Sequence, residues 1–208
     1  MSIFEHYDAL IFDLDGTLAD TMPLHLKAWE LTAQQFGFAF DRDYFYTLGG
    51  IPTRETLEII AQKQNSPLDI DSAGAYKTEK YLSIRDDLGV IAETRDLVFK
   101  NSGRLPIGVA TGSSRDEALF TLDKIGLTQF IDTLISSDDV LNPKPAADTF
   151  AKVAELLKID PAKCLAFEDT KIGYQSATAA GMHCLMVIDG VIQGLTELTD
   201  QLALEKQV

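Results

Sequence analysis

Two aspartates follow directly on a short apolar segment near the start of the chain. Residues 9–12 (Ala-Leu-Ile-Phe) are typical of a strand buried on both faces, and Asp13 and Asp15 come next, before Gly16. Side chains at alternate positions point to the same side, so both carboxylates face the edge where parallel sheets bind ligands. Nucleophilic or acid–base chemistry would use such a pair, although a solvated Asp-Gly turn has the same sequence.

Two further segments present polar groups that suit a phosphate. Thr111, Gly112 and Ser113 follow the apolar residues 106–110 and lead into a helix start, where backbone N–H groups could hold phosphate oxygens. Lys144 stands between two prolines that stiffen the backbone around it. Each segment alone also fits an ordinary feature, a helix cap or a solvated loop lysine.

Two adjacent acids, Glu168 and Asp169, follow the apolar residues 164–167. Together with Asp13 and Asp15 they would place four carboxylates near one point, which costs free energy unless a cation lies among them. Hard oxygen ligands favour Mg²⁺ over zinc. With a lysine, a hydroxyl and helix N-terminal amides added, the set meets the needs of phosphoryl transfer.

The elements that must position these residues predict an α/β fold. Short apolar segments alternate with helical patterns from residue 106 onward, which indicates right-handed crossovers and a parallel sheet. The stretch from residue 18 to 87 shows only helical patterns. We therefore expect a core domain of residues 1–17 and 88–208, with a helical domain of residues 18–87 inserted after the first strand. Helices are expected at 22–36, 41–48, 53–64 and 71–87, and a surface helix or loose end at 190–208.

Composition narrows the classes of partner. The 208 residues carry 18 Lys and Arg against 32 Asp and Glu, a formal net charge of −14 at pH 7. Such an acidic surface repels nucleic-acid phosphates and anionic membranes, so neither is expected as a partner. Cys164 and Cys184 lack metal-ligand spacing and indicate a reducing compartment. The first residues show no signal-peptide pattern and no segment could span a bilayer, so a cytoplasmic protein is expected.

In their order along the chain, the motifs resemble those of the haloacid dehalogenase superfamily. The resemblance covers nearly the whole chain and implies a Rossmann-like α/β core with an inserted four-helix cap. The cap is similar to that of the subgroup containing β-phosphoglucomutase and small sugar-phosphate phosphatases. The matching segments are residues 12–18 (Phe-Asp-Leu-Asp-Gly-Thr-Leu) for the first motif, 110–113 for the second, 144–145 for the third, and 167–170 with Gly173 and 179–181 for the fourth.

The resemblance implies a role for each matching residue. Asp13 would attack phosphorus to form an aspartyl-phosphate, and Asp15 would protonate the leaving alcohol and later deprotonate water. Mg²⁺ would be held by Asp13, the main-chain carbonyl of Asp15 and Asp169, with Glu168 nearby. The expected substrate is a phosphate ester of a small metabolite, such as a hexose phosphate, and the protein is expected to be a monomer. The phosphate ligands would be Thr111, Gly112, Ser113 and Lys144.

A loop of the cap distinguishes a phosphatase from a mutase. In the mutase, a Ser-Arg-Glu-Asp-Ser segment grips the sugar phosphate, and the equivalent segment here runs from Gly50 to residue 56. A gapless match puts Thr53 where the mutase has its arginine, and only a one-residue shift would restore Arg54 to that place. We therefore expect a phosphatase and keep a β-phosphoglucomutase as the alternative.

Three other cap residues are expected near the substrate. His25 and Trp29 lie four residues apart on one helix face, and Lys77 matches a lysine that approaches the acid/base aspartate in the mutase. From the sequence alone, His25 also fits a packed or solvated histidine and Trp29 a core residue. Lys80 is close enough along the chain to take the place of Lys77.

A phosphate-sensing module without catalysis is the third hypothesis. Response-regulator receivers also combine an acceptor aspartate, Mg²⁺-binding acids, a threonine and a Lys-Pro pair. In them the acid pair and the acceptor lie on different strands, whereas Asp13 and Asp15 share one strand end. The presence of Asp15 favours an enzyme, since a stable phospho-switch gains nothing from a hydrolytic acid/base.

Overall fold

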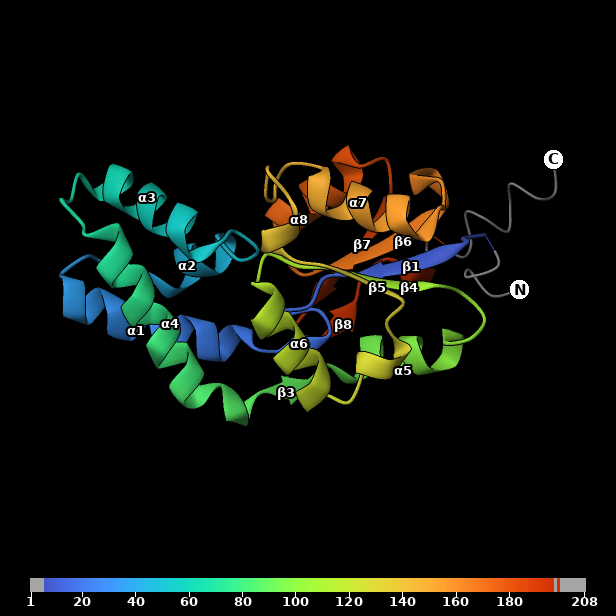
Figure 1. The fold of residues 1–208 in the computed structure, drawn as a ribbon, viewed down its shortest axis with the longest axis horizontal. Coiled ribbons are helices and arrows are strands. Elements are labelled where there is room, and N and C mark those ends of the chain that lie inside the picture. Colours follow the sequence, from blue (N-terminus) through green and yellow to red (C-terminus); the bar gives the residue numbers. More distant parts are fainter. Residues whose placement is uncertain (1–5, 197, 199–208) are drawn as a thin grey trace.

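The computed structural model describes residues 6–196 and 198, and at its centre lies a six-stranded sheet (Figure 1). Its strands are β1 (Ala9–Phe12), β4 (Ile107–Ala110), β5 (Thr133–Ile135), β6 (Cys164–Glu168), β7 (His183–Ile188) and β8 (Val191–Ile192). The strand order is β5-β4-β1-β6-β7-β8, and neighbours run parallel except for the antiparallel pair β7 and β8. The predicted α/β class with a mostly parallel sheet is confirmed.

Both faces of this sheet are buried, which explains the continuous apolar segments. In β1, Leu10 and Phe12 pack into one apolar cluster, and Ala9 and Ile11 pack into another on the opposite face. Polar residues follow where each strand reaches the sheet edge. The covering helices are α5 (Ala92–Asn101) and α6 (Arg115–Lys124) on the first face, and α7 (Asp148–Leu157) and α8 (Lys171–Ala179) on the second (Figure 1).

Four helices form a helical lobe (residues 22–84) beyond one end of the sheet (Figure 1). They are α1 (Met22–Phe36), α2 (Arg42–Thr47), α3 (Thr53–Gln64) and α4 (Ile70–Ile84). The lobe has an apolar cluster of its own, which includes Leu26, Phe45 and Leu57. Helix α1 ends as predicted, where Gly37 adopts a φ of +76°. No helix in the described part of the chain is long and apolar enough to cross a membrane.

The chain enters and leaves the lobe through two adjacent strands. β2 (Ala19–Asp20) and β3 (Gly89–Val90) pair antiparallel. Helix α4 is shorter than the predicted 71–87, because a 3₁₀ turn, η2 (Arg85–Asp87), leads from it into β3. The predicted domain boundaries beside residues 18 and 87 lie next to this strand pair and stay a prediction.

The expected surface helix or loose end at 190–208 is correct in part: Leu195, Thr196 and Leu198 are helical, but a short strand precedes them. Residues 191–192 form β8, which extends the sheet by pairing with Val187 and Ile188 of β7. The last part of the predicted segment, residues 199–208, lies outside the described residues.

Candidate active site

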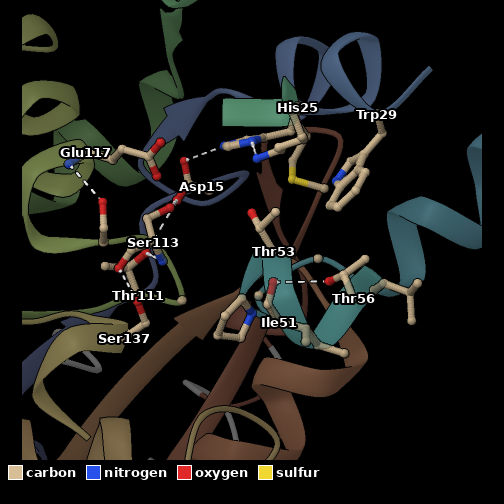
Figure 2. Close-up of a pocket in the computed structure, with 18 of the residues that line it drawn as sticks. Asp15, His25, Trp29, Ile51, Thr53, Thr56, Thr111, Ser113, Glu117 and Ser137 are labelled. Atoms are coloured by element: carbon tan, nitrogen blue, oxygen red, sulfur yellow. Dashed lines mark hydrogen bonds and ion pairs between the residues drawn. The ribbon is translucent and has the colours of Figure 1, made fainter. Parts of the chain in front are cut away.

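A cavity of about 370 Å³ lies between the carboxyl ends of the strands and the helical lobe (Figure 2). Its core side comes from the loops after β1 and β4, and its lobe side from α1, α4 and the loop before α3. The structure thus brings together most of the residues that were singled out in the sequence. The predicted residues that line the cavity are Asp13, Asp15, His25, Trp29, Gly50, Thr53, Lys77, Thr111, Gly112 and Ser113.

Behind this cavity, Lys144 lies between two carboxylates. Its Nζ donates hydrogen bonds to Asp13 Oδ1 at 2.6 Å and to Glu168 Oε1 at 2.9 Å, and its side chain is 0% exposed. Burial alone would lower the pKa of this lysine, but the two carboxylates raise it above its usual range. The other oxygen of Glu168 accepts hydrogen bonds from the amide and hydroxyl of Thr170 at 2.6 and 2.9 Å. Glu168 therefore holds Lys144 against Asp13 with both of its oxygens engaged.

The acids of this buried group carry more negative charge than one lysine can balance. Asp13, Glu168 and Asp169 bring carboxylate oxygens within 4.8 Å of one another, and all three residues are buried. Burial raises the pKa of Asp13 to about 8, with Lys144 opposing the shift and Glu168 adding to it. Burial and the charges of Glu168 and Asp13 also raise the pKa of Asp169 well above its usual range. The donor set fits a divalent cation bound by oxygen ligands.

Asp15 lies in very different surroundings. Its carboxylate accepts hydrogen bonds from the hydroxyls of Thr21 and Ser113, each at 2.7 Å, and from that of Thr111 at 3.3 Å. Nε2 of His25 lies 3.4 Å from Oδ1. Burial favours a higher pKa for Asp15, but the hydrogen bond and charge of His25, with the hydroxyl donors, lower it below its usual range. The two aspartates of one strand end thus have opposite pKa shifts.

His25 and Lys77 connect the helical lobe to Asp15. Nζ of Lys77 donates to Nδ1 of His25 at 3.1 Å, which leaves the ring proton on Nε2, directed at Asp15. Burial lowers the pKa of His25, and the positive charge of Lys77 lowers it further. Lys80 instead forms an ion pair with Glu79. The structure therefore brings Lys77 to the cavity and turns Lys80 away from it.

The first two residues of α3 show where the arginine of this segment lies. Thr53, the first residue of α3, lines the cavity. Arg54 is 59% exposed and forms ion pairs with Asp71 and Glu58 on the outside of the lobe. The one-residue shift that would bring Arg54 to the substrate is therefore wrong for this structure.

Trp29 is both a residue of the cavity and a core residue of the lobe, so both interpretations of its position hold. The indole lines the cavity, and it also packs against Phe45 within the apolar cluster of the lobe, with ring centroids 5.4 Å apart. Because Trp29 lines the cavity and is also packed in the core of the lobe, the cavity has little freedom to change shape there.

Core and lobe meet backbone to backbone at two glycines. A Cβ added to Gly112 would lie 2.1 Å from the carbonyl oxygen of Gly50, so a side chain does not fit at this contact. Gly50 has a φ of +83°, which favours glycine. A Cβ at Gly50 would lie 3.5 Å from Cδ of Lys144. The loop before α3 therefore covers both Gly112 and the buried lysine.

Three residues of the site are not predicted above. Thr21 precedes α1 as a helix-capping threonine would, but its hydroxyl bonds to Asp15. Tyr46 of α2 donates to Asp169 Oδ2 at 3.1 Å, and Glu117 of α6 lines the cavity. A threonine before a helix start is a local signal, whereas Tyr46 and Glu117 reach the site only through the packing of lobe on core.

Comparison with known proteins assigns the chain to a family. Residues 10–187 match the family model of haloacid dehalogenase-like hydrolases. The chain is 36% identical over 185 residues to fructose-1-phosphate phosphatase YqaB of Escherichia coli, with 89% of this chain and 98% of the relative covered. It is 30% identical over 195 residues to a phosphorylated carbohydrates phosphatase of Thermotoga maritima, with 91% and 88% covered.

A solved structure of β-phosphoglucomutase from Clostridium difficile has a similar fold, with a TM-score of 0.76 and 26% identity over 86% of this chain and 83% of that one. Family model, relatives and fold all agree with the four motifs found in the sequence. The chain therefore belongs to the haloacid dehalogenase-like hydrolases, and the predicted family is confirmed.

Proposed function

We propose that this protein is a Mg²⁺-dependent phosphatase that hydrolyses a small sugar phosphate through an aspartyl-phosphate intermediate. The observation that carries the proposal is the contrast between two aspartates that line one cavity. Asp13 lies beside Lys144 and the buried acids, whereas Asp15 is held by the helical lobe through His25. A two-step phosphoryl transfer needs a nucleophile and an acid/base with separate surroundings. The names of the Escherichia coli and Thermotoga relatives support phosphorylated sugars as the substrate class.

In the first step, a carboxylate oxygen of Asp13 attacks phosphorus. The new P–O bond joins phosphorus to Asp13, and the P–O bond to the sugar breaks. The leaving sugar oxygen takes a proton from Asp15. The hydrogen bonds to Asp15 keep it ionised, and the negative charge of a bound phosphate would raise its pKa so that it carries this proton. Lys144 keeps Oδ1 of Asp13 in place throughout.

In the second step, the ionised Asp15 takes a proton from water as the water oxygen attacks phosphorus. The bond between phosphorus and Asp13 breaks, and inorganic phosphate leaves. His25 and the hydroxyls of Thr21 and Ser113 orient Asp15 for both proton transfers. We infer that residues 18–87 act as a cap whose closure excludes bulk water during the first step.

Mg²⁺ would be held by Asp13 and Asp169, with the main-chain carbonyl of Asp15 as the further ligand that the family resemblance implies. Glu168 would lie beside the cation, since its oxygens are engaged by Lys144 and Thr170. The cation would offset the negative charge of the phosphoryl oxygens and of the buried carboxylates.

Mg²⁺ is expected to bind more weakly as the pH falls below about 8. The pKa of Asp13 is raised to about 8, so below this value a proton must leave before the cation binds. The Kd for Mg²⁺ should increase by up to about tenfold for each pH unit below that value. Isothermal titration calorimetry at two pH values, one near the pKa and one well below it, measures this dependence. Equal Kd values at both would contradict Asp13 as a ligand.

The function is tested by phosphate release from a panel of sugar and other small phosphate esters. We expect release of inorganic phosphate from hexose or pentose monophosphates in the presence of Mg²⁺, and no release once EDTA is added. If no ester of a broad panel is hydrolysed, the proposed phosphatase is wrong.

A β-phosphoglucomutase is the second candidate, because the chain shares its fold with the Clostridium difficile enzyme. Against it stands the start of α3, which presents Thr53 to the cavity and directs Arg54 outward. A mutase would interconvert glucose 1-phosphate and glucose 6-phosphate when primed with the bisphosphate. Phosphate release without this interconversion would remove the second candidate.

A further inference from the structure

One carboxylate in the cavity wall takes no part in the mechanism above. Glu117 lies in the first turn of α6, and its backbone N–H donates to Oγ of Ser114 at 3.4 Å. The residue is only half-buried and lines the cavity, and Figure 2 shows its carboxylate on the side where Asp15 and His25 lie. Within the described part of the chain, this carboxylate has no hydrogen-bond or ion-pair partner.

Glu117 lines the same cavity as Lys77 and His25 of the lobe. Its charge raises the pKa of both Lys77 and His25, against the larger effect of burial. Asp15 acts on both groups in the same direction. A second anion in this part of the cavity would therefore meet the carboxylates of Asp15 and Glu117 as well as the ammonium group of Lys77.

The rest of the cavity lining combines apolar side chains with several hydroxyl groups. Among the described residues that line the cavity, Lys77 is the one lysine or arginine, because Lys144 lies behind Asp13 and Arg54 points outward. Hydroxyl groups from both sides of the cavity complete this wall: Thr53, Thr56, Thr78, Ser114 and Ser137. Such a wall suits the hydroxyls of a polyol and not a second phosphate.

We propose that Glu117 is a specificity-determining residue that accepts a hydrogen bond from a hydroxyl of the substrate and repels a second anionic group. The substrate class is then the monophosphate ester of a neutral polyol, and bisphosphates and phosphorylated acids are excluded. The inference rests on the proposed phosphatase function, since the phosphate to be cleaved must occupy the Asp13 end of the cavity. A second phosphate within about 8 Å of a partly exposed carboxylate loses on the order of tenfold in affinity.

The test compares two matched variants with fructose 1-phosphate and fructose 1,6-bisphosphate as ligands. Glu117→Gln removes the charge with little change in shape. Asp116→Asn removes a charge from the same helical turn, where Asp116 is exposed and outside the cavity lining. We expect the protein and Asp116→Asn to prefer the monophosphate in kcat/KM. In Glu117→Gln this preference should fall by about tenfold, mainly through a lower KM for the bisphosphate.

A second readout separates this inference from the proposed function. Calorimetric Kd values for the same two ligands, measured in the Asp13→Asn background with Mg²⁺, report discrimination without turnover. One outcome is that Glu117→Gln shifts the ratio of the Kd values for the bisphosphate and the monophosphate while the unsubstituted protein releases no phosphate from any ester. This result would refute the phosphatase and keep the inference. Phosphate release with an unchanged ratio in Glu117→Gln, or an equal change in Asp116→Asn, would refute the inference and keep the phosphatase. Failure of both ligands to bind would overturn the inference, whereas the phosphatase is overturned only if no ester of the broad panel is hydrolysed.

Discussion

Asp13→Asn is expected to lower phosphate release by roughly 10⁴-fold or more, because the amide cannot attack phosphorus and the remaining groups act only together with it. The substitution changes neither the shape nor the hydrogen-bond acceptor that faces Lys144 at 2.6 Å. We therefore expect the variant to fold normally by circular dichroism. Steady-state rates of phosphate release, measured with Mg²⁺ for the variant and for the unsubstituted protein, give the size of this decrease.

The control for this substitution is Asp8→Asn, the same chemical change at an exposed position beside the other end of β1. It should leave kcat/KM within about twofold, since exposed substitutions away from a site have small effects. Activity of Asp13→Asn close to that of Asp8→Asn would rule out the covalent mechanism. A phosphorylated protein that persists for hours would instead revive the phosphate-sensing hypothesis.

Lys144→Met is expected to cost about 3–5 kcal/mol of the free energy of unfolding, in addition to most of the activity. The ammonium is buried and bonds to Asp13 and Glu168, so its loss leaves two neighbouring carboxylates without a counter-charge. Urea unfolding in the absence of Mg²⁺ measures the change. Lys171→Met, at an exposed lysine at the start of α8, is the matched control and should change the free energy by less than about 0.5 kcal/mol.

The pH dependence of this loss follows from the direction of the pKa shifts. Folded Asp13 binds its proton more tightly than unfolded Asp13, so its contribution to stability falls as the pH rises from about 4 to about 8. Lys144, with a raised pKa, keeps its charge and its stabilising effect throughout this range. Without Lys144 the carboxylates repel one another unopposed, so the variant should lose more stability near pH 8 than near pH 5. An equal loss at both pH values would contradict this account of the buried group.

Much of the core side of the site is predictable from the sequence, because Asp13, Thr111 and Asp169 each follow a strand that is buried along its whole length. Such strands are continuous apolar segments, and the parallel order brings their carboxyl ends to one edge. The order of the strands therefore predicts that Asp13, Thr111 and Asp169 lie together, as they do. The ends of helices α1 and α3 are also predictable from the sequence. Each helix ends at a residue with a left-handed backbone conformation, Gly37 for α1 and Asn65 for α3.

Other features of the fold and the site depend on contacts between segments, which the sequence of one segment does not reveal. The strands β2 and β3 have two residues each and exist only because they pair with one another. Helix α5 buries Thr94 and Asn101 along with Val98, so it has little apolar periodicity to detect. The approach of Tyr46 to Asp169, like that of Glu117 to the cavity, arises when lobe and core come together. The sequence also does not fix which side of α4 faces the cavity, because a small rotation of this helix would bring a neighbour of Lys77 to the cavity in its place.

The contact between Gly112 and Gly50 joins core and lobe without a side chain from either residue. Backbone meets backbone there, whereas other contacts between lobe and core, such as those of His25 with Asp15 and Tyr46 with Asp169, use side chains. The side chains of Thr53, Ser114 and Glu117 line the same cavity and are not among the nearest neighbours of the two glycines. We therefore expect single substitutions of cavity-lining side chains to change substrate preference while the contact between Gly112 and Gly50 stays in place.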